Sequence, residues 1–172
     1  MDHTEQRALE AVQHLNYDFH QFTLPHFIQY LIQRRGRLIF VEEFSFSDEV
    51  HAAWIALGDV DYILYSAATH PVHQIHNILH ECGHMVLNHT GKDLKSLLSP
   101  ALLQSARELT ASVQGRLHTI NPADDLQELE AEAFVRLLQR EILVANRLEQ
   151  LTSRASSIHD LARFASKLGY ND

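Results

Sequence analysis

Two histidines four residues apart are the first residues in this chain whose types and spacing indicate chemistry. They belong to the pentapeptide HECGH at residues 80–84, and helical periodicity continues on both sides of it. Residues four apart on an α-helix project from one face, so the imidazoles of His80 and His84 can bind one zinc ion together. Glu81 follows the first histidine directly and is placed to accept a proton from water that the metal activates. The spacing therefore predicts the metal-binding helix of a zinc peptidase.

The third metal ligand is predicted to come from a second helix. A catalytic zinc normally has three protein ligands and one water, and the motif supplies only two. A strongly helical segment at residues 126–138 carries three glutamates spaced two residues apart. Periodicity alone does not choose between Glu128, Glu130 and Glu132. At least one of the three is expected to be an ordinary solvent-exposed glutamate, because charged residues mostly lie at the surface.

The remaining residues of the motif helix receive structural interpretations. Cys82 lies about 200° around the helix from each histidine, so its thiol is expected in the core. Gly83 costs about 1 kcal/mol relative to alanine inside a helix, which indicates that another backbone, such as the glutamate helix, packs against it. His76 is expected at the rim of a cleft or at the surface. His89 could cap the end of the helix or reach a substrate.

The periodicity of the chain predicts the elements that must position these residues. Strands are expected at residues 37–41, 50–57 and 60–66, the last two forming a hairpin through a Gly-Asp turn. Helices are expected at residues 4–16, 24–35, 70–89, 99–117, 126–150 and 157–168. The fold class is therefore α+β, mostly helical, with one small sheet of about three strands over the motif helix. The chain of 172 residues fits a single domain, residues 1–172.

Composition excludes several classes of function. A net charge of −8 argues against a broad nucleic-acid surface, which rests on lysine and arginine. The basic residues at 34–37 are interpreted as a solvated turn. No apolar run approaches the length of a membrane span, and the N-terminus lacks a signal-peptide pattern. One cysteine rules out an internal disulfide. The sequence therefore predicts a cytoplasmic protein that binds neither nucleic acid nor a membrane.

The two motifs, taken in order, resemble those of the ImmA/IrrE family of metallopeptidases. That family has HExGH followed by a helix close to ExEAxxFA, and this chain has HECGH at residues 80–84 and ELEAEAFV at residues 128–135. The resemblance covers about residues 25–145 and implies a zincin-like fold with helical extensions at both ends. Matched residue by residue, it places the third zinc ligand on Glu130. Val135 is a mild departure, because the family usually has alanine there.

The resemblance also implies an activity. Such a protein would be a zinc endopeptidase, with Mn²⁺ or another divalent ion as an alternative metal, that cleaves a helix-turn-helix transcriptional repressor encoded nearby. Glu81 would be the catalytic base. In zincin-like peptidases an extended substrate pairs with an exposed strand edge above the metal. The sequence does not choose the residue that stabilises the oxyanion; the candidates are Tyr62, Tyr65, His89 and His118.

Two other functions compete with a regulatory peptidase. The chain could be a zinc-stabilised, non-catalytic interaction module, such as the toxin-like or regulatory half of a two-gene pair. Glu81 argues against this, because a structural zinc site needs no carboxylate there and usually has four protein ligands, often cysteines. A general degradative protease is less consistent with a chain that shows no secretion signal or pro-segment.

Overall fold

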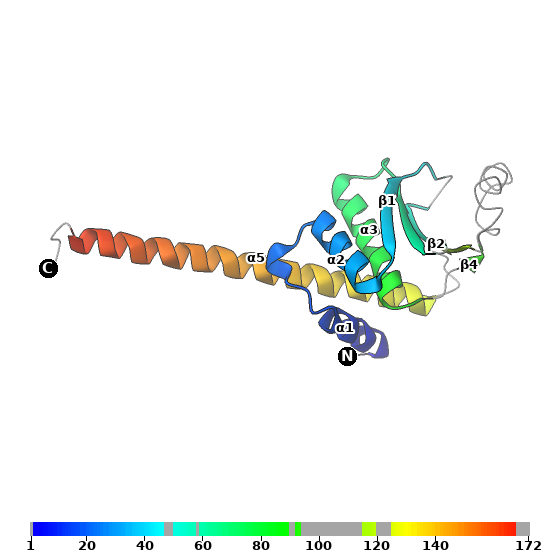
Figure 1. Ribbon diagram of the computed structural model, residues 1–172. Coiled ribbons are helices and arrows are strands. Elements are labelled where there is room, and N and C mark those ends of the chain that lie inside the picture. Colours follow the sequence, from blue (N-terminus) through cyan, green and yellow to red (C-terminus); the bar gives the residue numbers. More distant parts are fainter. Residues whose placement is uncertain are drawn as a thin grey trace.

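A computed structural model of the protein places residues 2–46, 50–57, 59–89, 92–93, 115–119 and 125–167 (Figure 1). Helices and one mixed sheet make an α+β fold, as predicted. In chain order the elements are α1 (His3–Leu15), the short 3-10 helix η1 (Phe19–Gln21), α2 (Leu24–Arg35), β1 (Leu38–Glu43), β2 (Ala52–Leu57), β3 (Val60–Tyr65), α3 (Pro71–Val86), β4 (Lys92–Asp93), β5 (Gly115–Thr119) and α5 (Asp125–Lys167).

Local sequence signals set the boundaries of the first helices. The side chain of Asp2 caps α1 by accepting a hydrogen bond from a backbone N–H of the first turn. The helix ends at Asn16, which adopts the left-handed conformation. Helix α2 has a proline in its first turn and ends at Gly36, where φ is +65°. Both helices therefore begin and end within one residue of the predicted bounds.

The three predicted strands form one mixed sheet. Strand β3 lies between β1, to which it is parallel, and β2, to which it is antiparallel. The predicted hairpin between β2 and β3 is confirmed. Two further strands extend the sheet in the order β1-β3-β2-β5-β4. The helix predicted at residues 99–117 is wrong at its C-terminal end, because residues 115–117 belong to β5; residues 99–114 lie outside the described part of the chain.

The core lies between the sheet and the helices. Helix α3 packs against β2 and β3 on one side and against α5 on the other, and α1 packs along α5. Cys82 is fully buried in this core, which confirms that its thiol is a small packing group. Its buried neighbours in the core come from the sheet and from both helices: Trp54, Ile63, Ile78, Leu79, Phe134 and Leu138.

Helix α5 is longer than predicted. Two helices were expected, at residues 126–150 and 157–168, but the chain continues as one helix over residues 125–167. The intervening residues contain no glycine or proline, so nothing in the sequence interrupts the backbone hydrogen bonds. Its N-terminal part packs in the body of the protein, and the rest extends away from it (Figure 1). Among the described helices, none is both long and apolar enough to cross a membrane.

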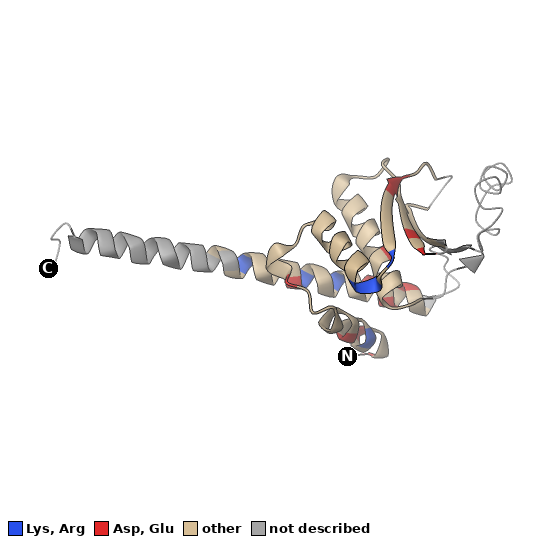
Figure 2. Cartoon of the chain, in the orientation of Figure 1, with Lys and Arg blue, Asp and Glu red and all other residues tan. Residues whose placement is uncertain are grey.

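Charge is distributed unevenly along α5. Glu128, Glu130 and Glu132 lie on its first turns, beside α3, whereas the next part of the helix carries Arg136, Arg140 and Arg147 with one described glutamate, Glu141 (Figure 2). The acidic end of α5 is therefore the end that faces the HECGH motif.

Candidate metal centre

Gly83 allows helices α3 and α5 to approach each other closely. A Cβ atom at this position would lie 3.1 Å from Cδ1 of Phe134 and 3.4 Å from both the Cα and the carbonyl oxygen of Ala131. These distances confirm the prediction that the glycine makes room for the glutamate helix. The acidic first turns of α5 are thereby held against the histidines of α3.

His80, His84 and Glu128 come together at this contact. The Nε2 atoms of the two histidines are 3.0 Å apart. Oε2 of Glu128 lies 3.1 Å from Nε2 of His80 and 3.5 Å from Nε2 of His84. Both histidines are buried, and Glu128 is largely covered. Three potential ligand atoms therefore converge from two helices on one point.

The spacing of this group is close to that of the ligand atoms around a zinc ion. In a tetrahedral site with bonds of about 2.0–2.2 Å, ligand atoms lie roughly 3.3–3.6 Å apart, close to the three distances observed here. Two neutral Nε2 atoms facing each other also repel unless a proton or cation lies between them. The second oxygen of Glu128, Oε1, is buried without a hydrogen-bond partner in the described part of the chain. The donor set fits a divalent cation.

The electrostatics of the group also favour a positive charge. Burial disfavours the charged ring of His80, but the carboxylates of Glu128 and Glu132 outweigh burial and raise the pKa of His80 to about 9. Burial similarly favours neutral Glu128, yet hydrogen bonds from His80 and His84 lower its pKa to about 2. The carboxylate is therefore ionised at neutral pH, as a metal ligand must be.

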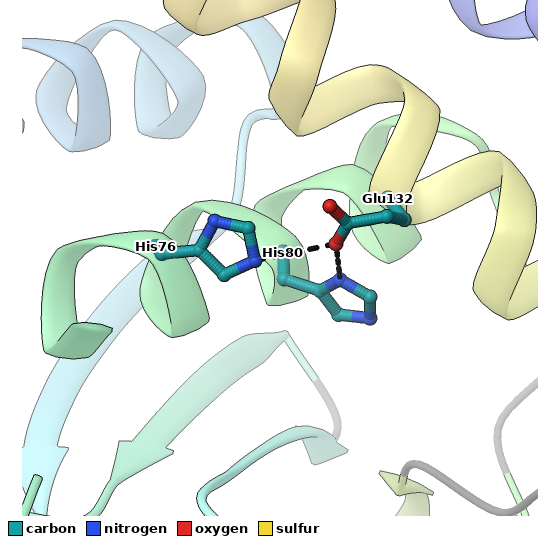
Figure 3. Close-up of side chains that lie close together, drawn as sticks. All are labelled: His76, His80 and Glu132. Atoms are coloured by element: carbon teal, nitrogen blue, oxygen red, sulfur yellow. Dashed lines mark ion pairs between the residues drawn. The ribbon is translucent and has the colours of Figure 1, made fainter.

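Glu132 and His76 lie on the other side of the His80 ring (Figure 3). Oε2 of Glu132 is 3.2 Å from Nε2 of His76 and 3.7 Å from Nδ1 of His80. These three residues could also hold a cation, but His80 would have to use Nδ1 in place of Nε2. A carboxylate behind a metal-binding histidine commonly orients its ring. The position of Glu132 fits that role, and His76 lies at the partly exposed rim of the site.

The structure does not bring Glu130, the ligand implied by the family resemblance, to the two histidines. Two residues along a helix turn the side chain by about 200°, so Glu128 and Glu130 point in opposite directions. Glu130 is fully buried and pairs with Arg7 of α1 and with His89. Burial lowers the pKa of His89, although the hydrogen bond to Glu130 opposes the shift. Glu128, left open by the periodicity, occupies the position expected of the third ligand.

Glu81 is buried without a hydrogen bond of good geometry to any described residue. Burial raises its pKa to about 8, although the charge of His80 and the nearby backbone N–H of Trp54 oppose the shift. A buried carboxyl group without partners costs stability. Buried groups with such raised pKa values are concentrated at functional sites, and this one directly follows His80 in the chain.

The predicted oxyanion candidates are scattered. Tyr62 stacks on Phe40, with ring centroids 5.5 Å apart, on the sheet face opposite to buried Ile63. Tyr65 packs against the core. His89 lies behind His84, away from its Nε2 atom. The backbone of His118 pairs with Trp54, but its side chain is outside what the structure describes.

Strand β2 does not supply the exposed strand edge on which an extended substrate is expected to pair. This strand packs on α3, but it lies between β3 and β5 in the sheet, so its edges are occupied within the described residues. Strand β5 comes from a region where no strand was predicted. The outer strands of the described sheet are β1 and β4, and on the β2 side an extended substrate could pair on β4 or take the place of β5.

Another buried carboxylate, Asp61, was missed by sequence reasoning. Asp61 of β3 is fully buried and binds Arg37, Arg35 and the indole N–H of Trp54, at 3.0–3.3 Å. The arginines at residues 34–37 are therefore not only a solvated turn, because two of them neutralise this carboxylate. An aspartate inside an otherwise apolar strand was the signal that could have found the cluster.

Neither the family models, nor the curated proteins, nor the solved structures with which the chain was compared gave a match.

Proposed function

We propose that this protein is a metal-dependent endopeptidase whose metal is held by His80, His84 and Glu128. The observation that carries the proposal is the buried carboxyl group of Glu81, which has no hydrogen bond of good geometry within the described residues, next to a cation-binding group of two histidines and a glutamate. A purely structural metal site gives no reason to bury such a carboxyl group. The motif and its resemblance to ImmA/IrrE peptidases support the same function.

The chain's own residues divide the chemistry between them. A bound zinc ion would supply a Lewis acid that polarises the scissile carbonyl and makes water more acidic. Glu81 acts as the general base that takes the proton from the attacking water, and the same carboxyl group then donates it to the leaving amine nitrogen. A cation beside Glu81 favours its ionised form, which this role requires. Glu132 orients the His80 ring from behind.

The substrate class follows from the resemblance and from the sheet. We propose that the substrate is a protein partner, such as a helix-turn-helix repressor, cut in a loop or in a helix that first unfolds locally. An extended segment is required because backbone groups inside a folded helix are already paired. Pairing on β4, or in place of β5, would align the segment with the sheet.

The experiment that tests this function has two stages. The purified protein is loaded with Zn²⁺ and its metal content is measured; we expect about one ion per chain. It is then incubated with the candidate repressor and, separately, with casein, and fragments are mapped by mass spectrometry. The matched control is Glu81→Gln, which should bind the metal and leave the repressor uncut.

Each outcome of this experiment discriminates between functions. No metal after reconstitution would exclude the proposed site. Rapid, unselective digestion of casein would indicate a general protease. A stable complex with the repressor that is never cut, with any divalent metal, would favour the non-catalytic interaction module.

A further inference from the structure

The turn after α3 folds the chain back beneath the metal centre. Asn88 adopts the left-handed conformation, with φ of 54°. Its backbone N–H donates to the carbonyl of Met85, and the N–H of His89 donates to the carbonyl of His84, at 3.3 and 3.0 Å. This is the Schellman arrangement, in which an asparagine can take the left-handed position. The turn therefore places the imidazole of His89 against the ring of His84.

A continuous line of polar contacts runs from this point to the N-terminal helix. Nδ1 of His84 lies 2.8 Å from Nδ1 of His89, whose Nε2 lies 2.9 Å from Oε2 of Glu130. The same oxygen accepts a hydrogen bond from Nη1 of Arg7, and Nη2 of Arg7 donates to the carbonyl of Leu87. The two histidines and the glutamate are buried, whereas Arg7 is partly exposed on α1.

Once a metal is bound, the hydrogen-bond donors and acceptors along this line determine which ring nitrogen of His84 and of His89 carries the proton. A metal on Nε2 of His84 requires the lone pair there, so the ring must carry its proton on Nδ1. Nδ1 of His89 lies within hydrogen-bond distance of that proton, and it accepts the proton only if it carries none itself. His89 then carries its proton on Nε2 and donates it to the carboxylate of Glu130. The contacts between His84 and His89 and between His89 and Glu130 then each have one donor and one acceptor.

We infer that His89, Glu130 and Arg7 form a positioning chain that holds the His84 ring with its Nε2 lone pair facing the metal. The inference rests on the proposed metal site, but it does not depend on peptide cleavage. Partners behind a metal-binding histidine set its orientation and basicity, and their loss typically lowers metal affinity about 10- to 100-fold. The chain makes α1, which supplies no ligand, part of the metal centre.

Variants along the chain test the inference through zinc affinity, measured by competition with a chromophoric chelator. His89→Phe fills the same space without hydrogen bonds and should bind zinc about 10- to 100-fold more weakly. His89→Gln, which retains a donor and an acceptor, should recover part of this loss. Arg7→Met should have a smaller effect of the same kind. Its matched control is Arg34→Met, because Arg34 also donates to a carbonyl at the end of a helix, that of Leu15, and is not part of the line from His84 to Arg7.

Spectroscopy measures properties that would not change if His89 only packed against its neighbours. The visible absorption of the Co²⁺-loaded protein should shift in His89→Phe and in Glu130→Gln, and stay unchanged in Arg34→Met. In zinc-loaded wild-type protein, ¹⁵N NMR should show His89 protonated on Nε2 and bare on Nδ1. The NMR measurement needs no variant, so it remains available if His89→Phe does not fold.

The inference fails if His89→Phe binds zinc within about twofold of wild type with an unchanged cobalt spectrum. It also fails if His89 is protonated on Nδ1 in the zinc-loaded protein. Wild-type protein that binds no zinc at all would instead contradict the proposed function. The two failures are therefore distinguishable.

Discussion

Asp61 and Glu81 are equally buried, at 0% and 1% exposure, but their surroundings are opposite. Asp61 accepts hydrogen bonds from two arginines and an indole, so adjacent positive charges compensate its negative charge. Neither oxygen of Glu81 has a hydrogen bond of good geometry among the described residues, and the backbone N–H of Trp54 is a nearby donor there. Both carboxyl groups lie close to Trp54, one bonded to its side chain and the other near its backbone.

In the proposed mechanism, the difference separates a carboxylate that holds the fold together from one that takes part in the chemistry. A buried charge is stable only when it is paired, so Asp61 is bound to its arginines and is not free to react. Burial disfavours the ionised form of Glu81 and raises its pKa to about 8. Groups with such shifts are concentrated at functional sites. The comparison predicts that the two residues affect different measurements.

The largest expected effect is on cleavage. Glu81→Gln should lower the rate of substrate cleavage by about 100- to 10,000-fold, because an amide cannot act as a general base. Unfolding in urea should show little change in the metal-free protein, since the pKa of about 8 leaves Glu81 mostly neutral at pH 7. A variant that cuts near the wild-type rate would remove Glu81 from the mechanism.

The next largest effect is on stability. Asp61→Ala should lower the free energy of unfolding by about 3 kcal/mol, at the low end for a broken buried ion pair, because both arginines are partly exposed. Zinc affinity should change little in the folded protein. The structural role of Asp61 would be contradicted if Asp61→Ala leaves urea unfolding unchanged, or if the variant stays folded but no longer binds zinc.

A third effect separates the two glutamates of α5. Glu128→Ala removes a proposed ligand and should weaken zinc binding by more than the roughly 10- to 100-fold expected for a residue behind the ligands. Glu130→Ala should fall within that range and should also lower stability, because it leaves Arg7 and His89 without their carboxylate. Chelator competition and urea unfolding on both variants measure the difference. The reverse order of affinities would restore Glu130 as the ligand.

The smallest effect concerns the contact between the helices. Gly83→Ala should destabilise the protein by about 1 kcal/mol, because crowding costs roughly 1–3 kcal/mol and the gain in helix propensity returns about 1 kcal/mol. The new methyl group would press on the buried ring of Phe134 and on the backbone of Ala131. Thermal unfolding measures the change. A clear stabilisation would show that the two helices have room to spare.

Local signals in the sequence were enough to predict most of the elements. The proline and glycine that bound α2, and the turn between β2 and β3, act on adjacent residues, so their effects can be read without the fold. The prediction failed where no local signal exists. Nothing in the sequence marks β5 as a partner of β2, and no helix breaker appears between the two helices that form α5.

The site was predictable in part for the same reason. The spacing of His80 and His84 is a property of one helix, and Gly83 indicated a close neighbour. The choice between Glu128 and Glu130 depends on how α5 is rotated against α3, which no pattern within α5 determines. The contact between Glu130 and Arg7 joins residues 123 positions apart, and periodicity cannot detect such a pair.

The placement of His84 on α3 and Glu128 on α5 also makes a bound metal a covalent-like cross-link between distant parts of the chain. An ion that binds only the folded protein stabilises it by about 2.7 kcal/mol at a free concentration 100 times its dissociation constant. A metal that joined His84 to Glu128 would also restrict the conformations of the unfolded chain between them. The melting temperature of this protein should therefore rise with the free zinc concentration, so that the amount of folded protein reports the zinc supply around it.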